Sequence, residues 1–299
     1  MTTILVLGGN GYIGSRIIHD LQSHFQMESV DLCWFGKDLG YSNRVDFRNL
    51  TKKFLSTFDA VLLLAGHSSV KMCDGNLLSS WNNNVSNFIN LVGKLDKEQH
   101  LIYASSGSVY GVTPIPLTED ILLDFKPINN YDLSKYSLDM NAMSLIANGH
   151  NITGLRFGTV NGWSPNVREE LMINSMTSGA IKNNYISINN AHIRRPILGI
   201  ADLSRAMHAI INSPKPGIFN LASFCDSVTG ISSSISKKLD VDIQRIPDTP
   251  NSFDFVMGMD KFEQAYNFEF KESTESIVTE LITRTDATYS NRNQCKNYE

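Results

Sequence analysis

The sequence contains little of what marks secreted, metal-binding or nucleic-acid-binding proteins. Its 299 residues include four cysteines, none in a Cys-x-x-Cys pair, so neither a zinc site nor a disulfide framework is indicated. The seven histidines have no metal-ligand spacing either, so we expect no metal. With 26 basic and 30 acidic residues the formal charge is −4, and there is no basic block, which argues against nucleic acid as a partner.

Long hydrophobic runs are also absent. The apolar segments are far shorter than the ~20 residues that a membrane-spanning helix requires. A strand-like run begins at Ile4, which leaves no room for a signal peptide before it. We therefore expect a cytoplasmic protein with no membrane partner. The content of 42% hydrophobic and 19% charged residues is ordinary for a globular chain, and the length suffices for one large core with a smaller lobe.

A glycine-rich turn follows the first predicted strand, Ile4–Leu7. Gly8 permits a tight turn, Gly11 lets the backbone approach a pyrophosphate, and Gly14 lets the next helix pack close to the strand. Helical spacing follows directly, so a diphosphate would meet the positive end of the helix dipole. This order of strand, glycine turn and helix predicts a dinucleotide-binding site. A tight turn without a ligand is the alternative.

A serine-rich strand end and a Tyr-x-x-x-Lys pattern indicate proton transfer. Ser106 lies just after the predicted strand Leu101–Ala104. Tyr131 and Lys135 are four residues apart, so on a helix they lie on one face, where the Lys charge favours the phenolate. A Ser hydroxyl orients a substrate alcohol, and the Tyr then takes its proton. Taken alone, the Tyr-x-x-x-Lys pattern also fits an exposed helix face.

Apolar strand-like runs alternate with helical stretches as far as about residue 160. This alternation predicts an α/β fold with a doubly wound parallel sheet, Rossmann-like, and a second, smaller substrate-binding lobe. We assign residues 1–160 with 195–222 to the dinucleotide-binding domain and residues 161–194 with 223–299 to the lobe. The polar residues 285–299 predict a frayed tail. The expected strands are Ile4–Leu7, Val61–Ala65, Leu101–Ala104, Ile152–Phe157 and Ile218–Leu221, with Val30–Cys33 and Arg44–Asp46 less regular.

Together, the glycine turn and the Ser-Tyr-Lys arrangement resemble the extended short-chain dehydrogenase/reductase family, and within it the NAD-dependent nucleotide-sugar epimerase/dehydratase group. The resemblance extends from Ile4 to about Phe270. The 25 positions from Ser106 to Tyr131 are similar to the spacing in UDP-galactose 4-epimerases. The resemblance implies NAD as the cofactor, and Ser106, Tyr131 and Lys135 as the catalytic residues.

The resemblance also implies how NAD is held. Asp31 lies 17 residues after Gly14, where an acidic side chain would bind the adenosine ribose. Its carboxylate would repel a 2′-phosphate, and Leu32 offers no compensating Arg, so NAD is favoured over NADP; a simple turn Asp is the alternative. Asn84 matches a helix residue that supports the active site, with Asn83 as its rival. The implied cofactor-binding residues are Gly8, Gly11, Tyr12, Ile13, Gly14, Asp31, Asp46, Phe47, Leu64, Ala65, Gly66, Asn84, Tyr131, Lys135 and Gly158.

A nucleotide-sugar substrate is implied as well, with Ser106, Thr159, Asn174 and Arg195 as its contacts. Arg195 falls where an Arg grips the nucleotide diphosphate with its bidentate fork, and Asn174 matches a weaker diphosphate contact. Two positions depart from the family pattern: Thr159 stands where many epimerases have Asn, and Gly199 replaces the usual His. Ordinary surface roles for Arg195 and Asn174 stay open.

The activity that the resemblance implies is nucleotide-sugar 4-epimerisation through a transient 4-keto sugar, with NAD recycled. Dehydratases of this family that act at C4 and C6 carry Asp-Glu after the catalytic hydroxyl residue, whereas this chain has Gly107-Ser108, so we reject dehydration. A net 4-dehydrogenase or 4-keto reductase would use the same residues and is the closest alternative. A non-catalytic NAD-binding sensor or scaffold is a remote alternative, because Ser106, Tyr131 and Lys135 are all present.

Two predicted helices, within residues 81–95 and 133–146, are too apolar for burial on one side only. The resemblance implies that they form a four-helix bundle in a homodimer. Coverage by the substrate lobe and loops is the alternative. The apolar residues are Trp81, Val85, Phe88, Ile89, Leu91, Val92 and Leu95 on the first helix, and Leu133, Tyr136, Leu138, Met140, Met143, Leu145 and Ile146 on the second.

Overall fold

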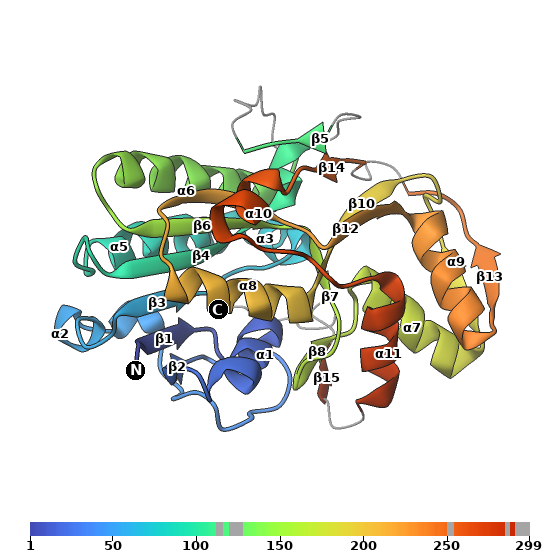
Figure 1. Ribbon diagram of the computed structural model, residues 1–299, viewed down its shortest axis with the longest axis horizontal. Coiled ribbons are helices and arrows are strands. Elements are labelled where there is room, and N and C mark those ends of the chain that lie inside the picture. Colours follow the sequence, from blue (N-terminus) through green and yellow to red (C-terminus); the bar gives the residue numbers. More distant parts are fainter. Residues whose placement is uncertain (112–115, 120–127, 250–253, 285–287, 291–299) are drawn as a thin grey trace.

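A parallel sheet of six strands forms the centre of the computed structural model (Figure 1). The structure describes residues 1–111, 116–119, 128–249, 254–284 and 288–290. The strand order is β11-β6-β4-β3-β1-β2, and every neighbouring pair is parallel. The predicted α/β fold is therefore confirmed. The strands are β1 (Thr3–Leu7), β2 (Gln26–Val30), β3 (Ala60–Leu63), β4 (His100–Ser106), β6 (Ile152–Phe157) and β11 (Gly217–Leu221).

Helices cover both faces of this sheet, as Figure 1 shows. Successive side chains of a strand point to opposite faces, and in β1 Ile4 and Val6 join one core cluster while Leu5 and Leu7 join the other. The first cluster packs against α1 (Tyr12–Leu21), α8 (Ile200–Asn212) and α10 (Asp260–Tyr266). The second packs against α2 (Lys52–Leu55), α5 (Asn87–Val92) and α6 (Asn130–Ala147).

Helix α6 begins directly at the position of the Tyr-x-x-x-Lys pattern. Asn129 is its N-cap: the side-chain Oδ1 accepts a hydrogen bond of 2.9 Å from the backbone amide of Asp132. The preceding strand β4 runs into a short 3-10 helix, η3 (Gly107–Tyr110). The chain between β3 and β4 forms α3 (Val70–Asp74), α4 (Leu77–Trp81), a π-helix η2 (Asn82–Ser86) and then α5.

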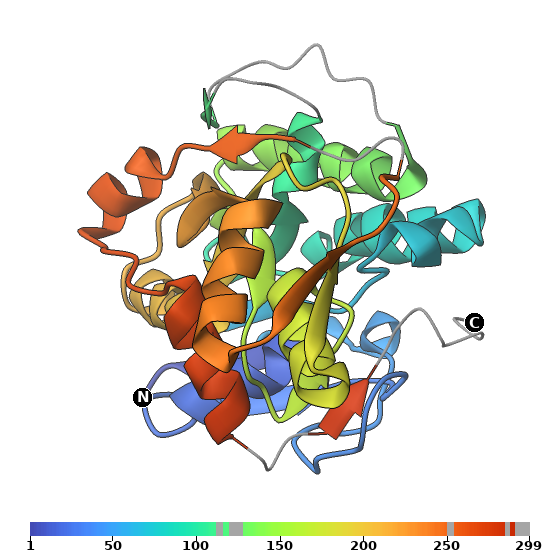
Figure 2. The ribbon, with the colours of Figure 1, turned by 90° about the vertical axis from the view of Figure 1, so that its right-hand side faces the viewer.

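The smaller lobe lies at one end of the sheet and faces the viewer in Figure 2. It has its own core, in which Trp163, Ile186 and Ile235 are buried. Its elements include a three-stranded sheet of β12 (Phe224–Ser227), β10 (Arg194–Gly199) and β7 (Thr159–Asn161), a pair of β13 (Asp242–Arg245) and β9 (Tyr185–Ile188), and the helices α7 (Met172–Asn183), α9 (Val228–Leu239) and α11 (Thr274–Thr283). Two further pairs join β14 (Val256–Met257) to β5 (Pro116–Leu117) and β15 (Thr288–Ser290) to β8 (Asn166–Arg168).

Three local predictions differ from the structure. The second strand ends at Val30, and Cys33 has a positive φ of 55°, because the chain already turns there. Residues 44–46 do not form a strand; Asp46 instead caps the 3-10 helix η1 (Phe47–Asn49). The polar tail was expected to fray, yet β15 pairs with β8, while residues 285–287 and 291–299 lie outside the described part.

The described helices also bear on the membrane question. None of them combines the length and the apolar character that crossing a bilayer requires. The assignment of residues to two domains stays a prediction. The prediction assigns residues 195–222 to the dinucleotide-binding domain. Of these, β11 is a strand of the main sheet and α8 packs against that sheet, whereas β10 pairs with β7 and β12 in a separate sheet.

Candidate active site

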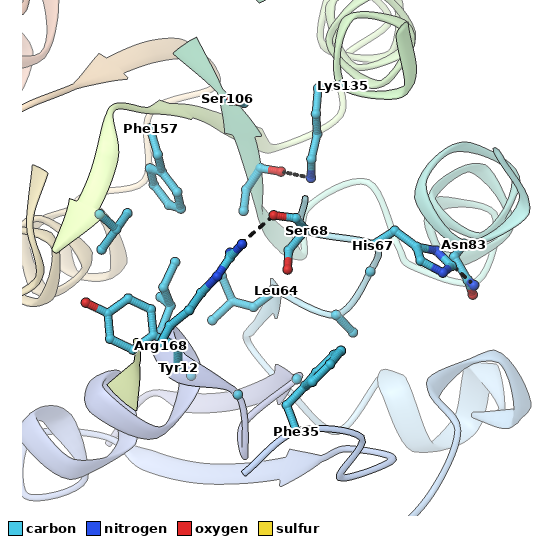
Figure 3. Close-up of a pocket in the computed structure, with 18 of the residues that line it drawn as sticks. Tyr12, Phe35, Leu64, His67, Ser68, Asn83, Ser106, Lys135, Phe157 and Arg168 are labelled. Atoms are coloured by element: carbon cyan, nitrogen blue, oxygen red, sulfur yellow. Dashed lines mark hydrogen bonds between the residues drawn. The ribbon is translucent and has the colours of Figure 1, made fainter. Parts of the chain in front are cut away.

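A cavity of about 330 Å³ opens at the carboxyl ends of β1, β3 and β4. The glycine turn and the Ser-Tyr-Lys residues both line it, although they are separated by about 100 residues in the chain. In parallel α/β sheets, ligands bind at this edge. The structure therefore brings the two sequence motifs into one site (Figure 3).

The glycine turn is built for close approach. Gly8 has a φ of +97°, and a Cβ there would lie 2.8 Å from the backbone nitrogen of Ala65. A Cβ on Gly14 would collide with the carbonyl oxygen of Gly8. The first backbone amides of a helix have no acceptor within that helix. Helix α1 begins at Tyr12, and no side chain caps its N-terminus. Gly8, Gly11, Tyr12, Ile13 and Gly14 all line the cavity.

Asp31 lies on the cavity wall just after β2. Its Oδ2 accepts a hydrogen bond of 2.9 Å from the amide of Asn10, and its Oδ1 accepts one of 2.7 Å from the amide of Cys33. The carboxylate thus joins the glycine turn to the end of β2. Asp46 and Phe47 are also on the wall, and the Asp46 carboxylate is held by the Arg48 guanidinium at 2.7 Å.

Leu64, Ala65 and Gly66 follow directly after β3, and all three line the cavity. Asn84 does not. It is 3% exposed and lies behind this segment, where its Oδ1 accepts from the amide of His67 and its Nδ2 donates to Ser134 Oγ at 2.9 Å. The rival residue, Asn83, is on the wall. A contact of Asn84 with the cofactor stays a prediction; in this structure the π-helix turns its amide toward the loop and α6, as suits a residue that supports the site.

Ser106, Tyr131 and Lys135 meet at the far side of the cavity. Ser106 comes from β4 and lines the cavity with Tyr131, and its Oγ is hydrogen-bonded to Ser108 Oγ at 2.8 Å. Burial raises the pKa of Tyr131 to about 12, whereas the Ser106 hydrogen bond and the positive charge of Arg168 oppose this rise. The groups that act to lower the pKa of Tyr131 are therefore Ser106 and Arg168.

Lys135 has a different partner from the expected one. Its Nζ donates a hydrogen bond of 2.8 Å to the carbonyl oxygen of Ala104 (Figure 3). The same atom lies 5.8 Å from the centre of the Tyr131 ring. Burial lowers the pKa of Lys135 to about 8. The prediction that Lys135 lowers the pKa of the phenol is not met in this geometry, because the ammonium is directed at the strand instead.

Arg168 is a cavity residue that the sequence motifs missed. It extends from β8 across the cavity, and its Nη1 donates to the carbonyl oxygen of Ser68 at 3.2 Å (Figure 3). Its Nε is paired with Glu170 at 2.6 Å. Arg168 begins an Arg-Glu-Glu segment whose sequence separation from the glycine turn and from the Tyr-x-x-x-Lys pattern follows no known rule, so no sequence motif predicted its role. Other lining residues outside the predicted set include Trp34, Phe35, His67, Ser68, Ser108 and Phe255.

Three of the four predicted substrate residues, Ser106, Thr159 and Arg195, line the cavity, as does Gly158. Asn174 does not line it. Its Oδ1 accepts from the amide of Gly162 at 2.9 Å, and its Nδ2 donates to the carbonyl oxygen of Arg168 at 2.9 Å. A substrate contact of Asn174 stays a prediction; in this structure its amide holds the loop after β7 and the end of β8.

Comparisons with known proteins agree with this geometry. A family model described as the NAD dependent epimerase/dehydratase family matches residues 4–222. A UDP-glucose 4-epimerase of Lactobacillus helveticus is 30% identical over 175 residues, which is 54% of this chain and 52% of the relative. The chain thus aligns with about half the length of that relative.

Solved structures show the same fold. A UDP-glucuronic acid 4-epimerase from Bacillus cereus, in complex with UDP-glucuronic acid and NAD, superposes with a TM-score of 0.82 at 20% identity and covers 94% of this chain and 98% of its own. TunA, an NAD dependent NDP-hexosamine 5,6-dehydratase, superposes with a TM-score of 0.83 at 20% identity and covers 96% and 99%.

Proposed function

The chain belongs to the NAD dependent epimerase/dehydratase family, and on that premise we propose that it is a nucleotide-sugar 4-epimerase acting through a transient 4-keto sugar. It is an enzyme, and its cofactor is NAD. The observation that carries the proposal is that Ser106, Tyr131 and Lys135 line the same cavity as the glycine turn. The lining of this cavity includes both the glycine turn and Arg195, the residue expected to bind the substrate diphosphate.

The residues of the site fit NAD. The turn packs closely against Ala65 and against the start of α1 because Gly8 and Gly14 carry no Cβ, and the amides that open α1 suit a diphosphate. Asp31 supplies acceptor oxygens for ribose hydroxyls, and Lys135 is placed to hold the nicotinamide ribose. When bound, NAD accepts a hydride from the sugar and returns it.

The side chains of this chain perform the proton transfer. Tyr131, as phenolate, takes the proton of the sugar 4-hydroxyl, and Ser106 orients that oxygen by a hydrogen bond. Arg168 stabilises the phenolate by its positive charge, which opposes the rise in the pKa of Tyr131 that burial causes. Arg195 is placed to pair with the substrate diphosphate. Thr159 occupies the wall between them and would contact the sugar or its phosphates.

The acidic pair, Asp-Glu, that serves as acid and base in the dehydratases is absent after Ser106 in this chain. Gly107 and Ser108 follow Ser106, and Ser108 presents a hydroxyl rather than a carboxyl to the cavity. The epimerase proposal is therefore preferred over a dehydratase, even though TunA shares the fold. A net 4-dehydrogenase or 4-keto reductase, and a non-catalytic NAD-binding sensor, are the other outcomes that the following experiment separates.

The test incubates the purified protein with a panel of UDP-, GDP-, CDP- and dTDP-sugars and no added cofactor. We expect one nucleotide sugar to be converted to its C4 epimer, with no net change in absorbance at the reduced-nicotinamide band, because the hydride is returned. Chromatography resolves the epimers. Accumulation of NADH with a 4-keto product would replace the epimerase by the dehydrogenase. No conversion of any sugar by protein with bound NAD would support the sensor.

Cofactor choice gives a further prediction. Asp31→Ala should weaken NAD binding by roughly 10- to 100-fold, the loss of about 1.5–3 kcal/mol expected for hydrogen bonds to a charged group, and should narrow the preference for NAD over NADP. Titration calorimetry with both cofactors measures this. Asp38→Ala is the matched control, because Asp38 is an exposed loop carboxylate beside the site and does not line the cavity. Equal affinities of the wild type for NAD and NADP would show that Asp31 is not the ribose ligand.

We also propose that the protein forms a homodimer through α5 and α6, which lie side by side (Figure 1). Some apolar residues of these helices, such as Phe88 and Leu138, are buried in the core. Ile89, Met140 and Met143 are 46%, 44% and 43% exposed. These three side chains are the apolar surface that a second copy would cover.

Met140→Glu should convert this dimer to a monomer, because it would bury a charge at the centre of the proposed bundle. Sedimentation velocity at micromolar concentration gives the mass. Ile181→Glu is the control, since Ile181 is 63% exposed on α7 of the lobe. A wild type that sediments as a monomer contradicts the homodimer.

A cytoplasmic location is the last part of the proposal. Cys33, Cys73 and Cys225 are free thiols, and Cys73 is fully buried. Free thiols are typical of a reducing compartment. Cell fractionation with an antibody against the protein tests this location.

A further inference from the structure

A buried network of charged and polar side chains lies behind the catalytic residues. Asp139 Oδ2 accepts a hydrogen bond of 2.8 Å from Arg156 Nε, and Asp139 Oδ1 accepts one of 2.8 Å from the Tyr103 hydroxyl. Asp139 is 1% exposed and Arg156 is 6% exposed. None of these three residues lines the cavity, so the proposed chemistry does not use them directly.

The network continues to the segment that carries Ser106. Arg156 Nη1 donates to the Tyr110 hydroxyl at 2.8 Å, and this hydroxyl donates to Asn220 Oδ1 at 2.8 Å. Tyr110 ends the 3-10 helix η3, whose first residue follows Ser106. The guanidinium of Arg156 also lies 5.0 Å from the centre of the Tyr110 ring. A single side chain, Arg156, therefore connects α6 with η3.

Asp139 lies on the same face of α6 as the two catalytic residues of that helix. Tyr131, Lys135 and Asp139 are spaced by four residues each, which places them one turn apart in succession. The room for the network is provided by Gly154, because a Cβ there would collide with the Tyr103 hydroxyl that reaches Asp139. Strand β6 thus contributes both Arg156 and the gap through which Tyr103 passes.

We propose that Asp139 and Arg156 are positioning residues: their buried ion pair fixes α6 against the segment that carries Ser106 and places a negative charge one turn from Lys135. This inference rests on the proposed function, in which Ser106, Tyr131 and Lys135 are the catalytic residues. A buried pair of this kind specifies one arrangement of the elements that it joins, and either partner left alone is an uncompensated buried charge.

The electrostatic surroundings of Lys135 make the proposal testable. The groups that face it are Tyr131 and Asp139 on α6 and Cys73 on α3, with Tyr103 on β4, Arg156 on β6 and Tyr110 on η3 behind Asp139. Burial of Lys135 lowers its pKa to about 8, and Cys73 and then Asp139 oppose this lowering. Burial raises the pKa of the Cys73 thiol to about 11. Of these two groups Asp139 is the carboxylate, and it lies on the same face of α6 as Lys135.

The experiment measures the pKa of Lys135 directly, by NMR of protein carrying 13C-labelled lysine, with Lys135→Met to assign the signal. Asp139→Asn keeps the shape of the side chain but removes the charge, and it should lower the pKa of Lys135 by about one pH unit. Arg156→Gln leaves Asp139 without its counter-charge and should raise that pKa. Opposite shifts in two variants of one ion pair are not expected from a loss of packing alone.

A third variant separates position from charge. Arg156→Lys keeps the positive charge, but one ammonium lacks the fork that serves Asp139 and Tyr110 together. We expect an unchanged pKa of Lys135 and a turnover lowered by on the order of 10- to 100-fold, because Ser106 is displaced from Tyr131. Asp202→Asn is the matched control: Asp202 is also 1% exposed, but it lies on α8 at the other face of the sheet. It should leave the pKa of Lys135 as in the wild type.

The pKa measurement needs no sugar substrate, so its failure is distinct from a failure of the epimerase assay. Shifts in the same direction in Asp139→Asn and Arg156→Gln, or no shift in either, would overturn the proposal. Thermal unfolding verifies that each variant is folded. If Asp139→Asn does not fold, Tyr110→Phe is used in its place. It removes the hydrogen bond from Arg156 to η3 and leaves the ion pair between Asp139 and Arg156 intact. Lower turnover with an unchanged pKa of Lys135 then supports the proposal, and wild-type turnover overturns it.

Discussion

Tyr131→Phe is expected to lower turnover by about 10²–10⁴-fold, the usual contribution of a positioned general acid–base group. The substitution removes only the hydroxyl of Tyr131, a residue that lines the cavity together with Ser106. The ring and its contacts remain, so the thermal unfolding temperature and the affinity for NAD should change little. Turnover is measured with the sugar that the panel identifies, and NAD affinity by calorimetry.

Two companion variants make this result specific. Tyr136→Phe is the control, because Tyr136 lies on the same helix but does not line the cavity, and its turnover should match the wild type. Lys135→Met should lower turnover and also weaken NAD binding, since Lys135 is expected to hold the nicotinamide ribose. Near wild-type turnover of Tyr131→Phe on the true substrate would refute the proposed chemistry.

Gly14→Ala is the second substitution with a large expected effect. The added Cβ would collide with the carbonyl oxygen of Gly8 and lie 2.8 Å from the Cα of Gly9, and both atoms belong to the backbone of the turn. Helix α1 must then move away from β1, which removes the amides of Tyr12 and Ile13 from the diphosphate position. We expect NAD affinity to fall at least roughly 100-fold, or about 2.8 kcal/mol, and stability to fall by about 1–3 kcal/mol from overpacking.

Gly93→Ala is the matched control for this variant. Gly93 ends α5 in a right-handed helical conformation, and a Cβ there would meet its nearest neighbours at 3.6 Å, an ordinary contact. The control should bind NAD like the wild type. Both proteins are compared by calorimetry and by urea unfolding. Wild-type NAD affinity in Gly14→Ala would mean that the cofactor does not lie over the glycine turn.

The parts of the fold that follow from local chemistry were predictable. Ile4–Leu7 is an apolar run, and both it and Ile152–Phe157 are buried along their whole length, as is typical of central parallel strands. The second strand was misplaced by a few residues, because its first half is polar and exposed at the sheet edge. There the position of Gln26–Val30 is decided by pairing with β1 rather than by its own pattern.

The residues of the candidate site also fall into those that local sequence patterns predicted and those whose side-chain direction the fold decides. Residues within one motif, such as Gly8 and Gly14 or Tyr131 and Lys135, were found because turn and helix geometry relate their positions at short range. Asn84 and Asn174 have the expected residue type, yet the structure directs both amides into buried hydrogen bonds behind the cavity wall. Residue type does not determine side-chain direction when the partner is a distant loop.

The sequence by itself determined the central strand β1, the glycine turn and the shared helix face of Tyr131 and Lys135, because each depends on neighbours within one strand, turn or helix. Only the tertiary structure decided that Arg168 crosses the cavity to Ser68, that Lys135 donates to Ala104, and that Arg156 joins α6 to η3. Those contacts connect elements that are far apart in the chain. Their formation depends on how the sheet, the helices and the lobe pack, which no local pattern of residues encodes.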